Sequence, residues 1–369
     1  RVNNEGDGEG GFSGFSNYVY GLAAGNQVYI GEFNTGKIYQ YNTNYELIDT
    51  FKLVDSVGTG FPFAMAMDDS GKLWVANTNS HLISKFTSQG SLLLWFAGAF
   101  SMPSGFAFDN SGHIWVSDRL HHKIKKFNQD GDSLFAFGSE GSEKGEIDRP
   151  IGNNFFDKKI YIADSKNKRV SVFDTLGNFI SVIGDSTLFQ MPFGLVVDST
   201  GCLFVSDFLG NQVIEFDPYE NQLYKIDSIL DSPTGLALSP DANVLYVSDT
   251  RNKRVIAFQV RGEPPPGGGP QAYGDAYIDR LMFDVYPSLS AKQMNIRLQG
   301  FTGMKISLKV YDVTGRLIKT FYDNQLIKSN QIIMWDGIDD SGRRTPTGIY
   351  FIRLEMSDKS MTNKVIKLK

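Results

Sequence analysis

Short runs in which hydrophobic and polar residues alternate recur in a fixed order along residues 1–262, at intervals of about 43 residues. Each copy of the clearest run ends in an acid or an amide. A polar connection then leads to a second run that ends in an aromatic residue. The six copies begin at Val28, Leu73, Ile114, Ile160, Leu203 and Leu245. Alternation with a period of two predicts β-strands, and a repeat of this length made of short strands is typical of a propeller or a solenoid.

The residues at the edges of each repeat predict how its strands turn and pair. A proline, usually followed two residues later by glycine, opens the first strand, as in PSGFAFD at Pro103 and PFGLVVD at Pro192. Proline fixes φ at the turn, and glycine allows two backbones to approach closely near a crowded axis. The acid or amide that closes the second strand falls at Glu32, Asn77, Asp118, Asp164, Asp207 and Asp249.

A basic residue follows three of these acids at a spacing of five. The pairs are Asp164/Arg169, Asp249/Arg254 and Asp118/Lys123. We expect each pair to bridge the connection between the second and third strands of its repeat. Because the arrangement recurs from repeat to repeat, it favours a structural role over a catalytic one.

The strand count predicts a closed ring. Four antiparallel strands with apolar residues on both faces form a blade that must stack on its neighbours. The sixth repeat ends near Val260 after only three strands, and residues 1–14 read as the end of a fourth strand. We therefore expect an all-β six-bladed propeller over residues 1–262, in which the N-terminal residues pair with the strand at 255–260.

A second β-rich unit is expected after a Pro/Gly linker at residues 263–273. Residues 274–369 show alternating segments separated by turn signals, which is the pattern of a small Ig-like β-sandwich. We expect Trp335 to pack in its core. The acids of the nearby loop, Asp336, Asp339 and Asp340, fit turn positions. A Ca²⁺ loop is the alternative, although they lack the ligand spacing of an EF-hand.

Composition and charge limit the classes of molecule that the protein is expected to bind. The 369-residue chain has a net charge of −5. Residues 274–369 hold 15 basic and 10 acidic side chains, so residues 1–273 hold 36 − 15 = 21 and 41 − 10 = 31. An acidic first unit argues against nucleic acid as a partner. No apolar run is long enough to span a bilayer, and the lone Cys202 reads as a small buried filler.

Two stretches resemble known families. The pattern of DSKNKRVSVF and DTRNKRVIAF, with Pro-x-Gly and V-x-D upstream, resembles NHL repeats. The segments VYDVTGRLIKTF and WDGIDDSGRRTPTGIYFIRL resemble the Ig-like domain of flagellar hook-capping proteins and the related C-terminal sorting domains of the type IX secretion system. The resemblance implies a bacterial protein that the outer-membrane secretion machinery exports to the cell surface or the extracellular space.

The residue after each proline is expected near the mouth of the central channel, with Asn153 beside it. These residues are Tyr20, Phe63, Ser104, Ile151, Phe193 and Thr234. Three aromatic residues among six could form a stacking platform for a sugar or a peptide. The alternative is that they plug the channel.

The resemblance also extends to enzymes built on NHL-like scaffolds, such as lyases and lactonase-type hydrolases. These enzymes line the channel mouth with His, Asp, Glu or Asn around a metal. His81, His121 and His122 lie in connections on the same side and could gather with Asp118 as a Zn²⁺ site. Solvated surface positions are the alternative. The sequence identifies no catalytic residue and requires no cofactor. It favours a binding or scaffold protein that recognises a peptide, protein or glycan, over a metal-dependent lyase or lactonase-type hydrolase or a structural component of a surface assembly.

Overall fold

The computed structural model describes residues 11–55, 58–227, 229–260, 282–286, 289–290, 293–299, 304–327, 331–356 and 360–368. The chain divides into two compact units, Arg1–Tyr277 and Ile278–Lys369. The linker expected at residues 263–273 lies outside the described residues.

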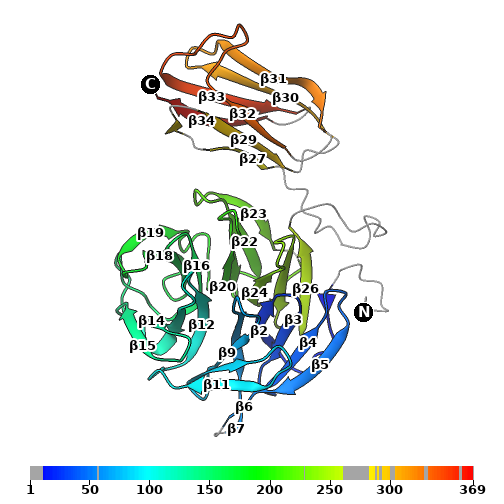
Figure 1. Ribbon diagram of the computed structural model, residues 1–369, viewed down its shortest axis with the longest axis vertical. Coiled ribbons are helices and arrows are strands. Elements are labelled where there is room, and N and C mark those ends of the chain that lie inside the picture. Colours follow the sequence, from blue (N-terminus) through cyan, green and yellow to red (C-terminus); the bar gives the residue numbers. More distant parts are fainter. Residues whose placement is uncertain are drawn as a thin grey trace. The chain divides into compact units, whose positions relative to one another are not determined.

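The first unit contains six four-stranded antiparallel sheets, which are the blades of a propeller (Figure 1). The first two blades are β2 (Val19–Ala24), β3 (Val28–Glu32), β4 (Lys37–Tyr41) and β5 (Leu47–Lys52), then β8 (Pro62–Met67), β9 (Leu73–Asn77), β10 (Leu82–Phe86) and β11 (Leu92–Phe96). A two-stranded hairpin, β6 (Val54–Asp55) and β7 (Gly58–Thr59), lies between them in sequence. The next two are β12 (Pro103–Phe108), β13 (Ile114–Asp118), β14 (Lys123–Phe127) and β15 (Ser133–Phe137), then β16 (Pro150–Phe156), β17 (Lys159–Asp164), β18 (Arg169–Asp174) and β19 (Phe179–Ile183). The fifth is β20 (Pro192–Val197), β21 (Leu203–Asp207), β22 (Gln212–Phe216) and β23 (Gln222–Ile226).

The sixth blade is assembled from both ends of the propeller sequence, as predicted. Its consecutive strands are β24 (Pro233–Leu238), β25 (Val244–Asp249) and β26 (Arg254–Gln259), and its outermost strand is β1 (Gly11–Phe12). Gly11 pairs with Ile256 in antiparallel register. Around the axis each innermost strand contacts the next, and β24 contacts β2, so the first and last blades lie side by side.

The pairing of the first two strands repeats from blade to blade. Pro103 lies opposite Asp118, Pro150 opposite Asp164, and a register shift follows each proline. This shift brings the glycine of the Pro-x-Gly motif against the backbone of the next blade. A Cβ on Gly152 would lie 2.5 Å from the carbonyl oxygen of Phe193, which is too close for any side chain. Glycine is therefore required there by the close approach of the blades, as the sequence predicted.

Apolar side chains of neighbouring blades pack against one another to form the core. Trp74 of β9 and Trp115 of β13 are fully buried, and a hydrophobic cluster joins Trp74 to residues of the third blade such as Phe127. Burying a large apolar side chain contributes about 1.5–3 kcal/mol, so the stacking of blades stabilises a ring that no single sheet could form. Cys202 is fully buried, which confirms its reading as a core filler.

The second unit is a β-sandwich of a three-stranded and a five-stranded sheet. The first sheet contains β27 (Met282–Tyr286), β29 (Met294–Gln299) and β32 (Gln331–Trp335). The second contains β28 (Leu289–Ser290), β34 (Ser360–Lys367), β33 (Gly348–Glu355), β30 (Lys305–Asp312) and β31 (Leu317–Leu326). Trp335 is 1% exposed and packs edge-on against Tyr350, with 5.2 Å between ring centroids, which confirms its predicted core position.

The acidic loop of the sandwich is held by its own hydrogen bonds. Asp339 accepts hydrogen bonds from the amides of Ser341 and Arg343, both at 2.9 Å. Asp340 accepts one from the amide of Thr320 at 3.0 Å. Asp339 therefore serves the turn, and Asp340 ties the loop to β31. Both roles are structural, which was the first of the two interpretations.

Candidate functional site

The propeller has two faces, one at each end of its central channel. We call the side on which the innermost strands begin, at residues such as Pro103 and Pro150, the loop face. The second strand of each blade ends there, because the first two strands run antiparallel. We call the opposite side, which carries turns such as 198–201 and 239–243, the turn face.

Buried acids and amides at the loop face hold the connections between blades. Asp118 accepts a hydrogen bond from the amide of Ser101 at 2.6 Å, and Asp164 accepts one from the amide of Asp148 at 2.8 Å. The same contact, made by the side chain that closes the second strand, occurs at Glu32, Asn77, Asp207 and Asp249. All six side chains are fully buried. Hydrogen bonds from Thr35, Asn17 and Ser16 outweigh the effect of burial, which alone would raise the pKa of Glu32, so this pKa lies below its usual value.

Two of the three predicted ion pairs are confirmed and one is corrected. Arg169 Nε lies 2.8 Å from Asp164 Oδ2, and the Asp249–Arg254 pair is 2.7 Å long. Asp118 pairs with Lys125 at 2.7 Å instead of with Lys123. Lys125 also donates hydrogen bonds to the carbonyls of residues 98 and 99 in the preceding connection. It thereby does for this blade what Arg169 does for the next, while Lys123 is exposed.

The aromatic residues expected at the channel mouth fill the channel near the loop face. Phe63, Ile151 and Phe193 form one buried cluster. Tyr20 packs against it, with 5.3 Å between its ring centroid and that of Phe63. Phe33 lies 4.7 Å from Tyr20 and Phe208 lies 5.6 Å from Phe193, centroid to centroid. We call these side chains the plug. Tyr20, Phe33 and Phe208 are its partly exposed members.

The three polar residues of the predicted mouth are buried in contacts between blades. Thr234 donates to the carbonyl of Val19 in the first blade at 3.3 Å, and Ser104 donates to the carbonyl of residue 150 at 3.0 Å. Asn153 donates to the hydroxyl of Ser117 at 3.0 Å. These side chains therefore stabilise the packing of blades in this structure.

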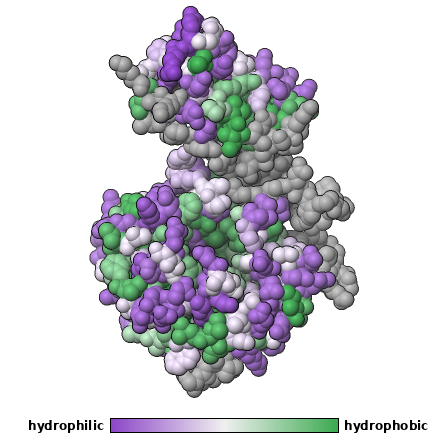
Figure 2. Space-filling model, viewed as in Figure 1, coloured by the Kyte–Doolittle hydropathy of each residue, from purple (hydrophilic) through white to green (hydrophobic). Residues whose placement is uncertain are grey.

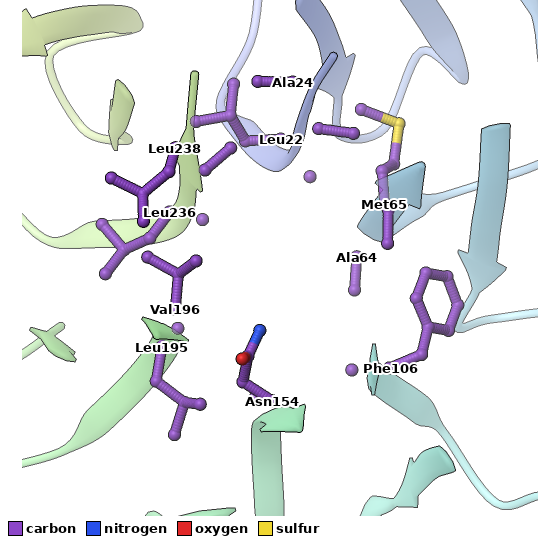
Figure 3. Close-up of a pocket in the computed structure, with 18 of the residues that line it drawn as sticks. Leu22, Ala24, Ala64, Met65, Phe106, Asn154, Leu195, Val196, Leu236 and Leu238 are labelled. Atoms are coloured by element: carbon purple, nitrogen blue, oxygen red, sulfur yellow. The ribbon is translucent and has the colours of Figure 1, made fainter. Parts of the chain in front are cut away.

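A pocket of about 380 Å³ lies in the central channel and extends to turns of the turn face. Figure 3 shows Leu22, Ala64, Val196 and Leu238 around it, with the amide of Asn154 pointing inward. The lining also includes Tyr20, Phe63, Ser104, Ile151, Asn153 and Phe193, six of the seven predicted mouth residues. These six residues line the end of the pocket that is nearest the plug, and the open part of the channel extends from there toward the turn face.

Of the four residues considered for a metal site, only His121 and Asp118 contact each other, and the four do not form one group with the spacing of metal ligands. His81 accepts a hydrogen bond from the amide of Met102 at 3.0 Å, and His122 accepts one from the amide of Arg149 at 3.3 Å. His121 lies 2.8 Å from Asp118. The two accepting histidines occupy left-handed positions, with φ of 58° and 55°. Each of the two histidines accepts a hydrogen bond from the backbone that leads into the next blade. The position that they share in the repeat therefore explains why a histidine stands there.

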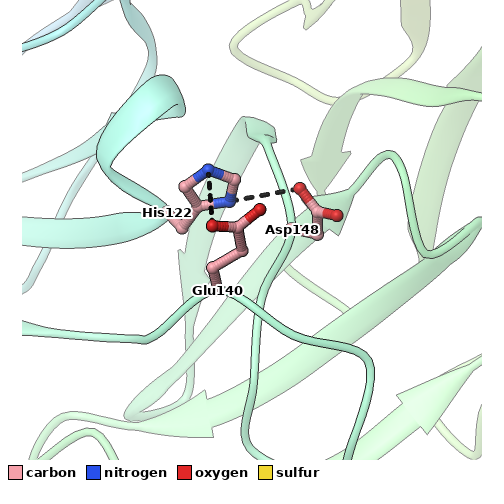
Figure 4. Close-up of side chains that lie close together, drawn as sticks. All are labelled: His122, Glu140 and Asp148. Atoms are coloured by element: carbon pink, nitrogen blue, oxygen red, sulfur yellow. Dashed lines mark ion pairs between the residues drawn. The ribbon is translucent and has the colours of Figure 1, made fainter.

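One group in the described part of the chain has the spacing of metal ligands. His122, Glu140 and Asp148 each offer a ligand atom within 4.8 Å of the others (Figure 4). His122 Nδ1 lies 3.1 Å from Asp148 Oδ1, and Nε2 lies 3.9 Å from Glu140 Oε2. Lys166 Nζ also lies 2.9 Å from Asp148 Oδ2. Sequence reasoning missed the two acids because they lie in the long connection between the third and fourth blades, outside the strand pattern from which the candidates were chosen.

Cationic side chains surround the plug on the loop face. Arg119 belongs to the short 3₁₀ helix η1 (Arg119–His121) that follows β13. Burial, reinforced by the positive charge of Arg149, lowers the pKa of the Arg119 guanidinium. Burial and the nearby Tyr18 raise the pKa of Tyr20, while the positive charges of Arg119 and Arg251 oppose this rise. The Arg251 guanidinium lies 6.0 Å from the centroid of the Phe208 ring.

Exposed apolar side chains are also found at the outer rim of the propeller. Leu92, Leu93 and Trp95 of the outermost strand β11 are each about half exposed. Figure 2 shows hydrophobic residues of this unit in separate patches with hydrophilic residues between them. Hydrophilic residues therefore interrupt the apolar surface on the face seen in that view.

Two sequence families match parts of the chain. Residues 284–368 match the secretion system C-terminal sorting domain. Residues 100–127, which lie in the third blade, match the NHL repeat. The chain therefore carries an NHL-type propeller and a sorting domain of the type IX secretion system. The sorting domain indicates secretion to the cell surface or the extracellular space, and hence an interaction with the secretion machinery. Among the described residues, no helix has the length and apolar character needed to cross a membrane.

Several solved structures share the propeller fold. The alignment with virginiamycin B lyase from Staphylococcus aureus covers 68% of this chain and 97% of that one, at 12% identity and a TM-score of 0.51. A gluconolactonase from Xanthomonas campestris aligns over 66% of this chain and 87% of its own, at 16% identity and a TM-score of 0.55. A protein of unknown function from Bacteroides thetaiotaomicron aligns over 68% and 72%, at 13% identity and a TM-score of 0.56. Similarity at this level of identity establishes the fold alone.

Proposed function

We propose that this protein is a secreted or cell-surface binding protein whose propeller recognises a ligand on the loop face, around the plug. In this proposal residues 1–262 form the binding domain, and residues 274–369 form the tail that delivers it to the cell surface. The partly exposed rings of Tyr20, Phe33 and Phe208 supply an apolar floor. Aromatic side chains of this kind contribute large contact areas with little loss of conformational freedom.

The observation that carries the proposal is the use made of the acidic groups on this face. The acids that close the second strands are fully buried and accept hydrogen bonds from backbone amides. A general acid or base must reach the substrate proton that it transfers. The plug members left partly exposed, Tyr20, Phe33 and Phe208, are aromatic, which suits recognition better than proton transfer.

A screen of the full chain against glycan and peptide arrays tests the proposal. We expect saturable binding to at least one class of ligand. Phe33→Ala and Phe208→Ala should weaken it, whereas Trp95→Ala on the outer rim should not. Turnover of a bound compound, or binding that depends on Trp95 and not on the plug, would contradict the proposal.

A metal-dependent lyase or lactonase-type reaction is the second candidate, and the His122, Glu140 and Asp148 group favours it. Lys166 already neutralises Asp148, and the amide of Arg149 already occupies His122 Nδ1. An ion bound through Asp148 Oδ2 and His122 Nδ1 would have to displace both contacts. Elemental analysis of the untagged protein distinguishes the candidates. A stoichiometric metal that is lost in His122→Gln would support the enzyme, and its absence from protein purified without chelators would count against it.

A further inference from the structure

Arg119 is singular among six equivalent positions of the propeller. The residue that follows the closing acid or amide of the second strand is Phe33, Thr78, Arg119, Ser165, Phe208 or Thr250 in the successive blades. The three hydroxyl residues donate hydrogen bonds to the first strand of the next blade, at 2.6, 2.6 and 2.8 Å. The two phenylalanines pack in the plug. Only the third blade places a charge at this position, although the fold needs none there.

The guanidinium of Arg119 has no partner among the described residues. Its Nε is buried without a hydrogen bond, and it makes no ion pair with a described residue. The adjacent Asp118 is fully committed to the amide of Ser101, to His121 and to Lys125. Buried charges in proteins are normally paired. A half-buried arginine left without an anion, with a second arginine nearby, is therefore unfavourable until a negative group binds.

The groups around Arg119 define what that ligand looks like. Arg149 adds a second, exposed positive charge, and the Tyr20 hydroxyl lies within the field of Arg119. Phe33 and Phe208, at the same position of the repeat in the first and fifth blades, are partly exposed members of the plug. A guanidinium fork matches the geometry of a carboxylate or sulfate group, and flat aromatic faces pack against the C–H face of a sugar ring. Of the rings that form the plug, only those of Tyr20, Phe33 and Phe208 are partly exposed, so the plug suits a single sugar ring better than an extended peptide.

We propose that Arg119, assisted by Arg149 and the Tyr20 hydroxyl, forms an anion subsite that binds the carboxylate or sulfate group of an acidic saccharide. Phe33 and Phe208 contact the sugar ring that carries this group. The inference rests on the binding function proposed above and names the class of ligand. Arg251 is not part of the subsite, because it is paired with Asp231 at 3.7 Å and lies over the Phe208 ring.

The test compares ligands that differ only in charge, using the full chain and isothermal titration calorimetry. The probes are an oligogalacturonate and its methyl ester, a chondroitin sulfate oligosaccharide and its desulfated form, and an oligoglutamate peptide. We expect at least one acidic saccharide to bind. Its neutralised form should bind at least roughly tenfold more weakly, because charge-assisted hydrogen bonds are lost. Arg119→Gln should reproduce that loss, Arg119→Lys should recover part of it, and Lys52→Gln on the outer strand β5 should have no effect.

The remaining outcomes separate this inference from the binding function itself. Equal binding of acidic and neutral saccharides, unaffected by Arg119→Gln, would overturn the anion subsite and leave the binding function standing. Binding of the acidic peptide in place of the saccharides would overturn the ligand class. No binding by a folded protein would overturn both. Thermal unfolding supplies the folding control, because removing an unpaired charge should leave the melting temperature of Arg119→Gln equal to or above that of the wild type.

Discussion

The Asp164–Arg169 pair allows a quantitative test of how the blades are joined. Asp164 is fully buried and accepts hydrogen bonds from the amide of Asp148, from Asn167, from Arg169 and from Ser171. Asp164→Asn keeps an oxygen for the amide of Asp148 but removes the charge that faces Arg169. The guanidinium, with a side chain 14% exposed, is then left without its counter-ion.

The magnitude follows from these contacts. A hydrogen bond to a charged group contributes about 1.5–3 kcal/mol, and complete loss of one buried partner costs about 3–5 kcal/mol. We expect Asp164→Asn to lower the free energy of unfolding by about 2–4 kcal/mol, since the amide bond survives while the ion pair does not. In the second blade the same two positions hold Asn77 and Leu82. The double variant with Arg169→Leu therefore reproduces a combination that the fold already contains.

The assay is equilibrium urea unfolding of the full chain, followed by tryptophan fluorescence, with a double-mutant cycle. Trp115 packs in one cluster with Ile160 and Ile162 of the fourth blade, so it reports on the region around Asp164. We expect Asp164→Asn and Arg169→Leu to be coupled by at least about 1 kcal/mol. Arg169→Leu also removes donors from carbonyls in the preceding connection, so the double variant should not regain the full wild-type stability. Coupling within about 0.3 kcal/mol of zero, or an effect no larger than that of the exposed Asp49→Asn, would refute the reasoning.

Three further predictions concern the ring. Gly152→Ala should lower the free energy of unfolding by about 1–3 kcal/mol, because its Cβ would meet the next blade. Gly25→Ala, where there is room for a Cβ, should not lower it. Equal melting temperatures for the two variants would disprove the close-approach argument. Phe12→Ala should cost about 3–5 kcal/mol in urea unfolding, because Phe12 is 3% exposed and packs with residues of the first and sixth blades; a negligible loss would show that β1 does not stabilise the ring. The lowered pKa of Glu32 stabilises the fold above its unfolded-state value of about 4.5, and this contribution is lost as the pH falls through the lower folded-state value. Melting temperature should therefore fall more steeply on acidification in the wild type than in Glu32→Gln, and parallel profiles would contradict this.

Much of the fold could be predicted because its determinants are local and repeated. The Pro-x-Gly motif and the closing acid recur in each blade, so the register of Pro150 against Asp164 follows from one rule applied throughout. The latch between β1 and β26 followed from counting strands. Ion pairs were predictable only where arginine holds the fifth position. At Asp118 two lysines on the same side of β14 compete, and side-chain reach selects Lys125.

The candidate site was predicted less well because it depends on side chains that converge across the axis. Tyr20, Phe63 and Phe193 come from three different blades, and neither their mutual contact nor the position of the pocket can be read from spacing within a repeat. Arg119 was missed for a different reason. It stands one residue beyond the conserved-looking pattern of the repeat, at a position where aligning the six blades would have shown a single charge among aromatic and hydroxyl residues.

The pairing of β1 with β26 bears on the order of the blades in the sequence. Because β1 runs antiparallel to β26, with Phe12 opposite Val255, a short hairpin could join residue 259 to residue 11 and make the sixth blade a continuous meander like the other five. The isolated ring could then be opened at any exposed connection without removing a strand from its sheet. We expect circular permutants of the propeller to fold, since its geometry assigns no blade the place of the first.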